Sequence, residues 1–295
     1  MVLKYFGIKV PTRIRTETVA ITDPNIYLDI VNAPEVIPIR IVFTIVNNEG
    51  RSLWFKITLV SAPEGYSMDD VEVGEVVDGG KVTVAVTLNR TKPASTDFME
   101  HEESVTLRVT AYTDSAYTAE FGHVDIDFSV FIINSDHPDW NTVAELNFDD
   151  GSLGIAEAVS DIVGTEGNCS TSTSVSDEAF VSPPYSVRVR LSTGAVVTNR
   201  CNRYIGLEFP IELPPSSKRY LIAYVRKEDS AVQETRVVMG ETEYYFNWAE
   251  VGRWFKFVVP VPEGVSRIKI TQYVYFQGAN MTVTFYIDSI KVIAR

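Results

Sequence analysis

Residues Lys81–Leu88 have the sequence KVTVAVTL, in which every second residue is a branched apolar one. Successive side chains of a β-strand point to opposite faces, so this stretch would turn one apolar face to a core and the other to water. A helix would scatter the same apolar residues around its axis. The stretch therefore predicts a half-buried strand.

Runs of β-branched and aromatic residues recur on both sides of this stretch, broken by Pro, Asn and Gly, and almost no segment has helical periodicity. In the first half they lie at Val19–Ile21, Ile26–Val31, Ile37–Val46, Leu53–Val60, Ser104–Tyr112 and Gly122–Ile133. In the second half they lie near Ser186–Leu191, Ile205–Ile211, Tyr220–Arg226, Thr235–Met239, Thr242–Asn247, Trp254–Val259, Arg267–Phe276 and Met281–Ile293. Seven or eight strands over about 120 residues are typical of an immunoglobulin-like sandwich, although the Cys–Trp–Cys pattern of antibody domains is missing.

A polar stretch with a proline, residues 134–139 (NSDHPD), separates the two halves of the chain. A length of 295 residues also suggests two domains, at roughly 100–200 residues per domain. We therefore predict an all-β protein of two β-sandwich domains. Residues 1–137 would form an N-terminal strand and an immunoglobulin-like sandwich, and residues 138–295 a jelly roll.

The chain is acidic, with 39 Asp and Glu against 26 Lys and Arg and a net charge of −13. Nucleic-acid binding and attraction to an anionic membrane both need clustered cations, so neither kind of partner is expected. No stretch approaches the 18 apolar residues of a membrane-spanning helix. Residues 1–138 hold 11 basic and 20 acidic groups, against 15 and 19 beyond, so the first half has the composition of a solubilising spacer.

The two cysteines, Cys169 and Cys201, lie 32 residues apart in the second half, a spacing that matches no zinc motif. Their polar flanks favour a disulfide, which would indicate an oxidising location, and two buried thiols are the alternative. Asn168-Cys169-Ser170 is one of three Asn-x-Ser/Thr sequons, the others starting at Asn89 and Asn280. So short a pattern is common by chance. The Ser/Thr-rich segment 168–177 is expected to be a loop.

Four segments of the second half carry a resemblance to a known family. They are Leu146–Gly151 (LNFDDG), Ser182–Val189 (SPPYSVRV), Trp254–Pro260 (WFKFVVP) and Phe285–Val292 (FYIDSIKV). With them, residues from about 143 to 295 resemble the jelly-roll family of carbohydrate-binding modules. The resemblance implies a non-catalytic domain that binds a glycan or, since fold does not decide function, a partner protein.

The same resemblance implies a structural calcium ion, held by the acidic residue of the first strand and the Asp of the last. By position these residues are Asp149 and Asp288. Ca²⁺ takes 6–8 oxygen ligands, which two carboxylates and backbone carbonyls could supply. The alternative is an Asx turn at Asp149 and a solvent-facing Asp288.

Motifs for catalysis are missing from the sequence, which holds neither a G-x-S-x-G elbow nor a phosphate-binding P-loop. Its three histidines lie in no known metal-binding pattern. His123, Asp125 and Asp127 would share one face of a strand, and we expect that face to be solvated rather than to bind metal. A carboxylate pair for glycoside hydrolysis is not recognisable without its spatial separation. We therefore predict that the protein is not an enzyme.

Aromatic residues of the second half are the stronger lead to function. Alternation along Arg267–Phe276 sends the apolar residues to one face and groups two tyrosines with basic residues on the other. Flat apolar faces of sugars stack on aromatic rings while their hydroxyls bind polar side chains. The candidate glycan-binding residues are Trp248, Trp254, Lys269, Tyr273 and Tyr275. The alternative is that these are ordinary half-buried aromatics, because strands favour Tyr and Trp.

The segment Val2–Val10 is apolar and ends before Pro11. It lacks the uninterrupted apolar region that a signal peptide has. The segment instead predicts a short strand. This strand could dock on its own domain, or add to the sheet of a neighbouring subunit and build a homo-oligomer or larger assembly.

Two classes of function remain open. The first is a structural or adhesion protein of a virion or extracellular surface, whose jelly roll binds a glycan or partner; the missing leader favours a virion. The second is an accessory carbohydrate-binding protein of a secreted polysaccharide-degrading system.

Overall fold

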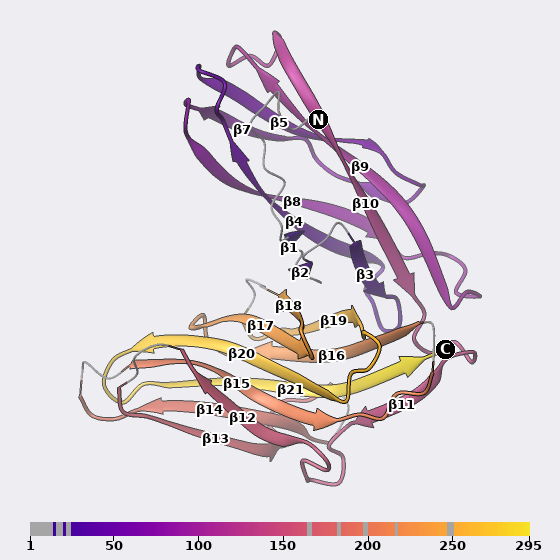
Figure 1. Cartoon of the computed structure of the whole chain (residues 1–295), viewed down its shortest axis with the longest axis vertical. Helices are drawn as coiled ribbons and strands as arrows, with labels where there is room; N and C mark the ends of the chain where they lie inside the picture. Colours follow the sequence, from indigo (N-terminus) through magenta and orange to yellow (C-terminus); the bar gives the residue numbers. More distant parts are fainter. Residues whose placement is uncertain are drawn as a thin grey trace. The chain divides into compact units, whose positions relative to one another are not determined.

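The structure is a computed structural model that describes residues 14–15, 20–21, 25–163, 167–181, 184–196, 200–215, 218–246 and 251–295. All regular secondary structure in these residues is β, and they contain no helix that could span a membrane. The chain divides into two compact units, Met1–Asn134 and Ser135–Arg295. Figure 1 shows the strands of both units.

Two sheets face each other in the first unit, and β1 (Ile14–Arg15) and β2 (Ala20–Ile21) form a separate two-stranded sheet. The five-stranded sheet has the order β3 (Asn25–Asp29), β10 (Glu120–Ile133), β9 (Glu100–Tyr112), β5 (Leu53–Ser61) and β7 (Val71–Val76). The three-stranded sheet has the order β4 (Val36–Val46), β8 (Lys81–Thr91) and β6 (Tyr66–Ser67). The first strand, β3, runs parallel to β10, and the other pairs of these two sheets are antiparallel.

Buried and exposed side chains alternate along the strands of the first unit, as the sequence predicts. In β8, Val86 and Leu88 are buried, whereas Lys81, Thr83 and Thr87 are exposed. The predicted His123 face of β10 is exposed, as expected, and its Asp125 pairs with Arg108 of β9 at 2.7 Å from Nε to Oδ1.

A buried ion pair fastens the two sheets of the first unit to each other. Arg90 of β8 donates from Nε and Nη2 to the two carboxylate oxygens of Glu103 on β9, at 2.9 and 2.8 Å. Tyr66 of β6 donates its hydroxyl to the same carboxylate at 2.5 Å, and its ring lies 5.0 Å from the guanidinium carbon. Burial alone would raise the pKa of Glu103, but the bonds from Arg90 and Tyr66 outweigh it and lower that pKa.

The second unit is a sandwich of two sheets in which every strand pairing is antiparallel. One sheet has the order β13 (Cys169–Ser176), β14 (Ser186–Thr193), β21 (Thr282–Ala294), β16 (Arg219–Lys227) and β19 (Trp254–Pro260), with β11 (Asn141–Leu146) also paired to β21. The other has the order β12 (Glu157–Ile162), β15 (Arg200–Pro210), β20 (Arg267–Gln277), β17 (Val232–Met239) and β18 (Thr242–Phe246).

The core of the second unit lies between these sheets and receives large side chains from both. Phe209 and Phe246 come from one sheet and Phe257 and Phe285 from the other, and all four are buried. The rings of Phe246 and Phe257 stack across the core with centroids 4.7 Å apart. The fold class is thus all-β with two sandwich-like bodies, which confirms the prediction.

One expectation about the second unit is wrong. Residues 168–177 were expected to form a loop, but Cys169–Ser176 is the edge strand β13. Its side chains are mostly exposed, so Ser and Thr are tolerated, and the full ladder to β14 supplies its backbone hydrogen bonds. The predicted strand Val2–Val10 lies outside the described residues.

Candidate functional site

Strand β20 divides its side chains between the core and the outer face of its sheet. Ile268, Ile270 and Val274 are fully buried, whereas Tyr273 is half-buried and Tyr275 is 40% exposed. The two tyrosines that the sequence singles out therefore lie on the solvent side of the sheet, where a ligand can reach them.

Neighbouring strands add further aromatic and polar side chains to this outer face. The pairing register sets Tyr204 of β15 and Glu234 of β17 opposite Tyr273, and Tyr245 of β18 opposite Arg236. We call this surface the tyrosine face. It consists of Asn202, Tyr204, Glu234, Arg236, Glu243, Tyr245, Lys269, Tyr273 and Tyr275.

The two central tyrosines of the face are held in place by contacts at both ends of their side chains. The ring centroids of Tyr204 and Tyr273 are 5.1 Å apart at an interplanar angle of 39°. Tyr273 donates its hydroxyl to Asn202 Oδ1 at 2.9 Å, and Tyr204 donates to Glu234 Oε1 at 2.7 Å. Burial, reinforced by the bond to Glu234, raises the pKa of Tyr204, so this hydroxyl stays protonated. The rings therefore form a surface whose shape is set before any ligand arrives.

Arg236 extends the same surface towards β18. Its guanidinium carbon lies 4.9 Å from the centroid of the Tyr204 ring and 6.0 Å from that of Tyr245, within cation–π range. Its Nε donates to Glu243 at 3.2 Å, and Tyr245 also donates its hydroxyl to that carboxylate. The bond to Glu243 raises the pKa of Arg236. The guanidinium is therefore positioned as part of the aromatic surface rather than as a mobile charge.

Two further cations of this sheet, Lys269 and Arg267, are also paired. Lys269 contacts Asp161 of β12 at 3.1 Å, and Arg267 contacts Glu208 at 2.9 Å and Glu157 at 3.5 Å. Glu208 lies on the adjacent strand β15, whereas Asp161 and Glu157 lie on β12, one strand further, so the pairs tie β12, β15 and β20 together across the sheet. A ligand that approaches Arg236, Arg267 or Lys269 therefore meets a cation whose charge is already compensated.

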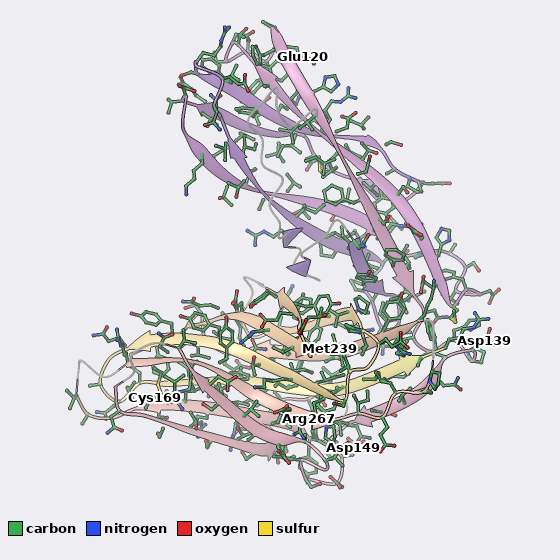
Figure 2. All side chains as sticks on the ribbon, in the orientation of Figure 1. Glu120, Asp139, Asp149, Cys169, Met239 and Arg267 are labelled. Atoms are coloured by element: carbon green, nitrogen blue, oxygen red, sulfur yellow. A yellow bond between two sulfur atoms is a disulfide. The ribbon has the colours of Figure 1, made fainter. Side chains whose placement is uncertain are left out.

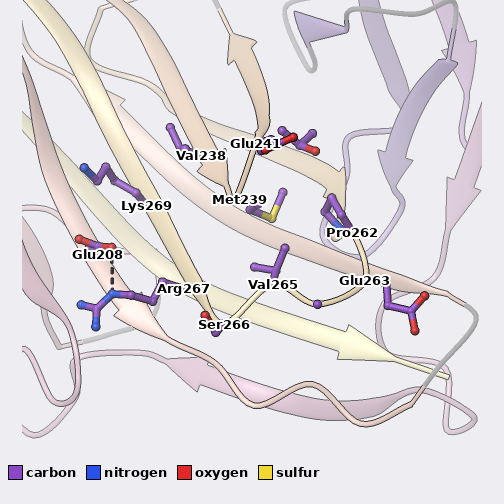
Figure 3. Close-up of a pocket in the computed structure, with 13 residues that line it drawn as sticks. Glu208, Val238, Met239, Glu241, Pro262, Glu263, Val265, Ser266, Arg267 and Lys269 are labelled. Atoms are coloured by element: carbon purple, nitrogen blue, oxygen red, sulfur yellow. Dashed lines mark hydrogen bonds and ion pairs between the residues drawn. The ribbon is translucent and has the colours of Figure 1, made fainter.

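A pocket of about 580 Å³ lies at one end of the tyrosine face (Figure 3). Lys269 belongs to both surfaces, which makes them continuous. Strand β17 supplies Met239 at its end, the turn after it supplies Glu241, and the loop between β19 and β20 supplies Glu263 and Val265. Its volume is in the range of small-molecule sites, so it can receive one end of an extended ligand.

The structure does not bring the two candidate tryptophans to this face. Trp254 begins β19 in the opposite sheet, where its ring centroid lies 6.4 Å from that of Tyr286. Trp254 was a candidate because it flanks a turn together with Trp248, but strand pairing sends β19 and β20 to different sheets. Trp248 lies outside the described residues.

The two residues proposed for calcium lie in different surroundings. Asp288 is fully buried, and its two carboxylate oxygens accept hydrogen bonds from the backbone N–H groups of Val181 at 2.6 Å and Ser289 at 2.7 Å. Asp149 is exposed in the loop that follows β11. Among the described residues, no three His, Cys, Asp or Glu side chains gather in a way that could hold a metal. Side chains of this part of the chain therefore do not make up a calcium site by themselves, and the ion stays a prediction.

The disulfide is present. Cys169 of β13 and Cys201 of β15 are joined with their Cα atoms 5.5 Å apart, inside the usual range. The bond connects the two sheets of the second unit, since β13 and β15 belong to different ones. A disulfide favours an oxidising compartment, which is the setting of extracellular proteins.

Sequence reasoning missed six members of the tyrosine face: Asn202, Tyr204, Glu234, Arg236, Glu243 and Tyr245. The expected strand at Ile205–Ile211 started too late, because β15 already begins at Arg200 and includes Tyr204. Alternation along an earlier start would have placed Tyr204 on the face opposite Ile205 and Leu207, which are buried. No local signal could have placed Arg236 between two tyrosine rings.

The chain matches no family model and no curated protein. Solved structures give distant matches. A structure of carbohydrate-binding modules from the β-sandwich superfamily is 10% identical over 88% of this chain and 98% of its own, with a TM-score of 0.36. The K1 adhesin domain of Lys-gingipain from Porphyromonas gingivalis W83 is 14% identical over 52% of this chain and 99% of its own, with a TM-score of 0.35. The CBM22 tandem domain of Paenibacillus barcinonensis Xyn10C is 14% identical over 87% of this chain and 83% of its own, with a TM-score of 0.32. Likenesses this distant do not decide what the chain binds.

Proposed function

We propose that this is a non-catalytic binding protein that holds a carbohydrate on the tyrosine face of its second unit. The observation that carries the proposal is the pair of Tyr204 and Tyr273, whose rings lie side by side and whose hydroxyls are fixed by Asn202 and Glu234. Aromatic rings held in this way offer flat apolar area without a further loss of side-chain entropy on binding.

The groups around these rings suit the rest of a sugar. Sugar hydroxyls both donate and accept hydrogen bonds, so they pair with carboxylates, amides and cations alike. Asn202 lies beside Tyr273, Glu234 lies beside Tyr204, and Lys269 lies four residues before Tyr273 on β20. The face therefore presents stacking area at its centre and hydrogen-bonding groups at its edges.

Charge limits which glycans fit. The described outer face and its strand neighbours hold four cations, Arg200, Arg236, Arg267 and Lys269, and the last three are paired with carboxylates. The carboxylates outnumber these cations; they are Glu157, Asp161, Glu208, Glu234 and Glu243. An anionic polysaccharide would have to displace an existing ion pair or approach surplus negative charge. We therefore propose an uncharged glycan as the ligand.

The disulfide suggests where this binding takes place. An extracellular surface, on which the second unit binds glycan and the acidic first unit serves as a spacer, is the setting we propose. A virion is the more specific form of that setting, and a neighbourhood of capsid and tail genes around the coding sequence would support it. A neighbourhood of glycosidase genes would instead favour an accessory protein of polysaccharide degradation.

The test is retention on immobilised neutral and anionic polysaccharides by the full chain and three variants. Replacing both Tyr273 and Tyr275 with Ala should weaken binding of a neutral glycan by roughly 5- to 150-fold, at about 0.5–1.5 kcal/mol per stacked ring. Tyr273→Phe keeps the ring and loses only the bond to Asn202, so its effect should be smaller. Trp254→Ala is the matched control, because it removes an aromatic side chain from the opposite sheet.

Equal retention of the wild type and the double tyrosine variant would reject the tyrosine face as the site. Loss of binding by Trp254→Ala alone would move the site to the other sheet. Stronger retention on uronate-containing than on neutral polysaccharides would contradict the charge argument.

A further inference from the structure

Two of the three sequons meet at one end of the second unit although 112 residues separate them in the chain. Asn168 immediately precedes β13 and Asn280 lies just before β21, and both strands pair with β14. Gly194, which follows β14, joins the two asparagines through its backbone. Its N–H donates to the carbonyl of Asn168 at 3.3 Å, and its carbonyl accepts the N–H of Asn280 at 3.0 Å. The two asparagines therefore lie on either side of one residue.

The hydroxyl-bearing residues of the two sequons likewise bind one residue of β14. Ser170 donates its hydroxyl to the carbonyl oxygen of Ser192 at 3.3 Å, and Thr282 shares a hydrogen bond of 3.0 Å with the hydroxyl of Ser192. Adjacent strands lie about 4.8 Å apart, so the two sequons are separated by roughly 10 Å across β14. The pairing of β13 and β21 with β14 thus places two sequons that are distant in the sequence next to each other.

Solvent exposure distinguishes this pair from the third sequon. Asn168, Ser170, Asn280 and Thr282 are all exposed. Asn89 is only half-buried in the middle of a sheet, where β8 pairs with β4 on one side and β6 on the other. A sugar chain on the first pair would extend into water from the end of a sheet, whereas one on Asn89 would have to leave from a strand enclosed by two neighbours.

Two features near the paired sequons are consistent with a surface that carries glycans. Cys169, between Asn168 and Ser170, forms the disulfide, so the first sequon belongs to a domain that folds under oxidising conditions, as N-glycosylated domains do. Two large apolar side chains at the same end are exposed, Val196 at 57% and Met281 at 38%. Exposed apolar groups favour association, and a hydrophilic chain near them would oppose it. In Figure 2 the labelled Cys169 marks this end of the unit, opposite the end marked by Asp149.

We propose that Asn168 and Asn280 are acceptors of N-linked glycans, which form a paired cover on the disulfide end of the second unit. The donor class is an oligosaccharide on a lipid diphosphate. The amide nitrogen Nδ2 of asparagine forms a bond to the anomeric carbon of the first sugar. The bond between that carbon and the phosphate oxygen breaks, and the lipid diphosphate leaves while the amide nitrogen gives up one proton. No oxidation or reduction takes place. The proposal concerns sugar attached to this chain and is independent of glycan bound by the tyrosine face.

The experiment is secretion of the full chain from a eukaryotic host behind a cleavable leader, followed by treatment with an amidase that removes N-glycans. We expect the mobility on a denaturing gel to change by two glycan units, and peptide mass spectra to show Asn converted to Asp at positions 168 and 280. Asn168→Gln and Asn280→Gln should each remove one unit and the double variant both. Ser170→Ala and Thr282→Ala should do the same with the asparagines intact, which guards against a variant that fails to fold. Asn89→Gln should change nothing.

A secreted, folded chain without any amidase-sensitive shift would overturn the proposal, as would a shift that persists in the double variant. A shift by only one glycan unit would overturn the proposal for the asparagine whose replacement by Gln leaves the mobility unchanged. Modification at Asn89 with the other two bare would overturn the argument from exposure.

Discussion

Replacement of Glu103 by Gln tests how much the buried ion pair contributes to the first unit. The substitution keeps the shape of the side chain but removes the charge that faces Arg90, and it turns one acceptor oxygen into a donor. Three hydrogen bonds end on this carboxylate, two from Arg90 and one from Tyr66. The side chains of Arg90 and Glu103 are 8% and 4% exposed, so water cannot replace the lost partner.

The expected loss in unfolding free energy is about 3–5 kcal/mol, because removal of one partner leaves the other charge buried and unpaired. Replacing both residues with apolar ones of similar size, Arg90→Met with Glu103→Leu, should cost much less than the single change, since no buried charge is then left. Tyr66→Phe removes a hydrogen bond to a charged group and should cost about 1.5–3 kcal/mol.

The structure offers a matched control on the same strand. Arg108 and Asp125 form a pair of the same bidentate geometry, with distances of 2.7 and 2.9 Å, but their side chains are 34% and 39% exposed. Asp125→Asn should therefore have a far smaller effect than Glu103→Gln, because water and salt screen the exposed pair. The measurement is urea unfolding of the full chain with Trp140, Trp248 and Trp254 replaced by Phe in every variant, monitored by circular dichroism and by the fluorescence of the remaining Trp54 in β5.

The Arg90–Glu103 pair should also make the stability of the first unit depend on pH in the acid range. The folded pKa of Glu103 is lowered, so its stabilising contribution is present above the pKa of an unfolded glutamate, roughly 4.3, and is lost as the pH falls towards the folded pKa. Glu103→Gln should remove this part of the acid sensitivity. If Glu103→Gln costs no more than Asp125→Asn, or leaves the acid profile unchanged, then burial does not decide the strength of these pairs and the reasoning fails.

Three further predictions concern the rest of the chain. Replacing Cys169 and Cys201 together with Ala should lower the unfolding free energy of the second unit by roughly 3–4 kcal/mol, as expected for a bridge that closes a loop of 32 residues; equal melting temperatures with and without reductant would show that the bridge does not form. Calcium at millimolar concentration should raise the melting temperature above that in EDTA if Asp149 and Asp288 bind the ion, and the shift should vanish in Asp149→Asn. Deletion of residues 1–11 should reduce the oligomer size seen by light scattering if that segment pairs with a neighbouring subunit, and an unchanged size would reject that role.

Most strands followed from local pattern, although β6, β7 and β12 were not expected from the sequence. Alternation with a period of two is a property of neighbouring residues, so Lys81–Leu88 and Arg267–Phe276 could be assigned, faces included, without any knowledge of their partners. Segment 168–177 failed because its composition suggested a loop, whereas an exposed edge strand tolerates Ser and Thr. The cysteine pair could be proposed because only one pairing is possible with two cysteines.

The candidate site could be only half predicted, since a binding face is made by residues from several strands. Tyr273 and Tyr275 share one strand and were found by alternation. Tyr204, Arg236 and Tyr245 join them through the register of β15, β17 and β18, and that register depends on pairings between distant segments. For the same reason Trp254, close to Tyr273 in sequence, lies on the other sheet.

By itself, the sequence determined the all-β class, the division into two halves, the acidic surface and the chemical types available for binding. These depend on composition and on side-chain periods that act over a few residues. Tertiary structure alone decided that Tyr204 lies against Tyr273, that Arg90 is buried against Glu103, and that Asn168 and Asn280 flank Gly194. Each of these contacts depends on pairing between strands that are distant in the sequence. That pairing is fixed only when both sheets of a sandwich bury their apolar faces together, so no local pattern specifies it.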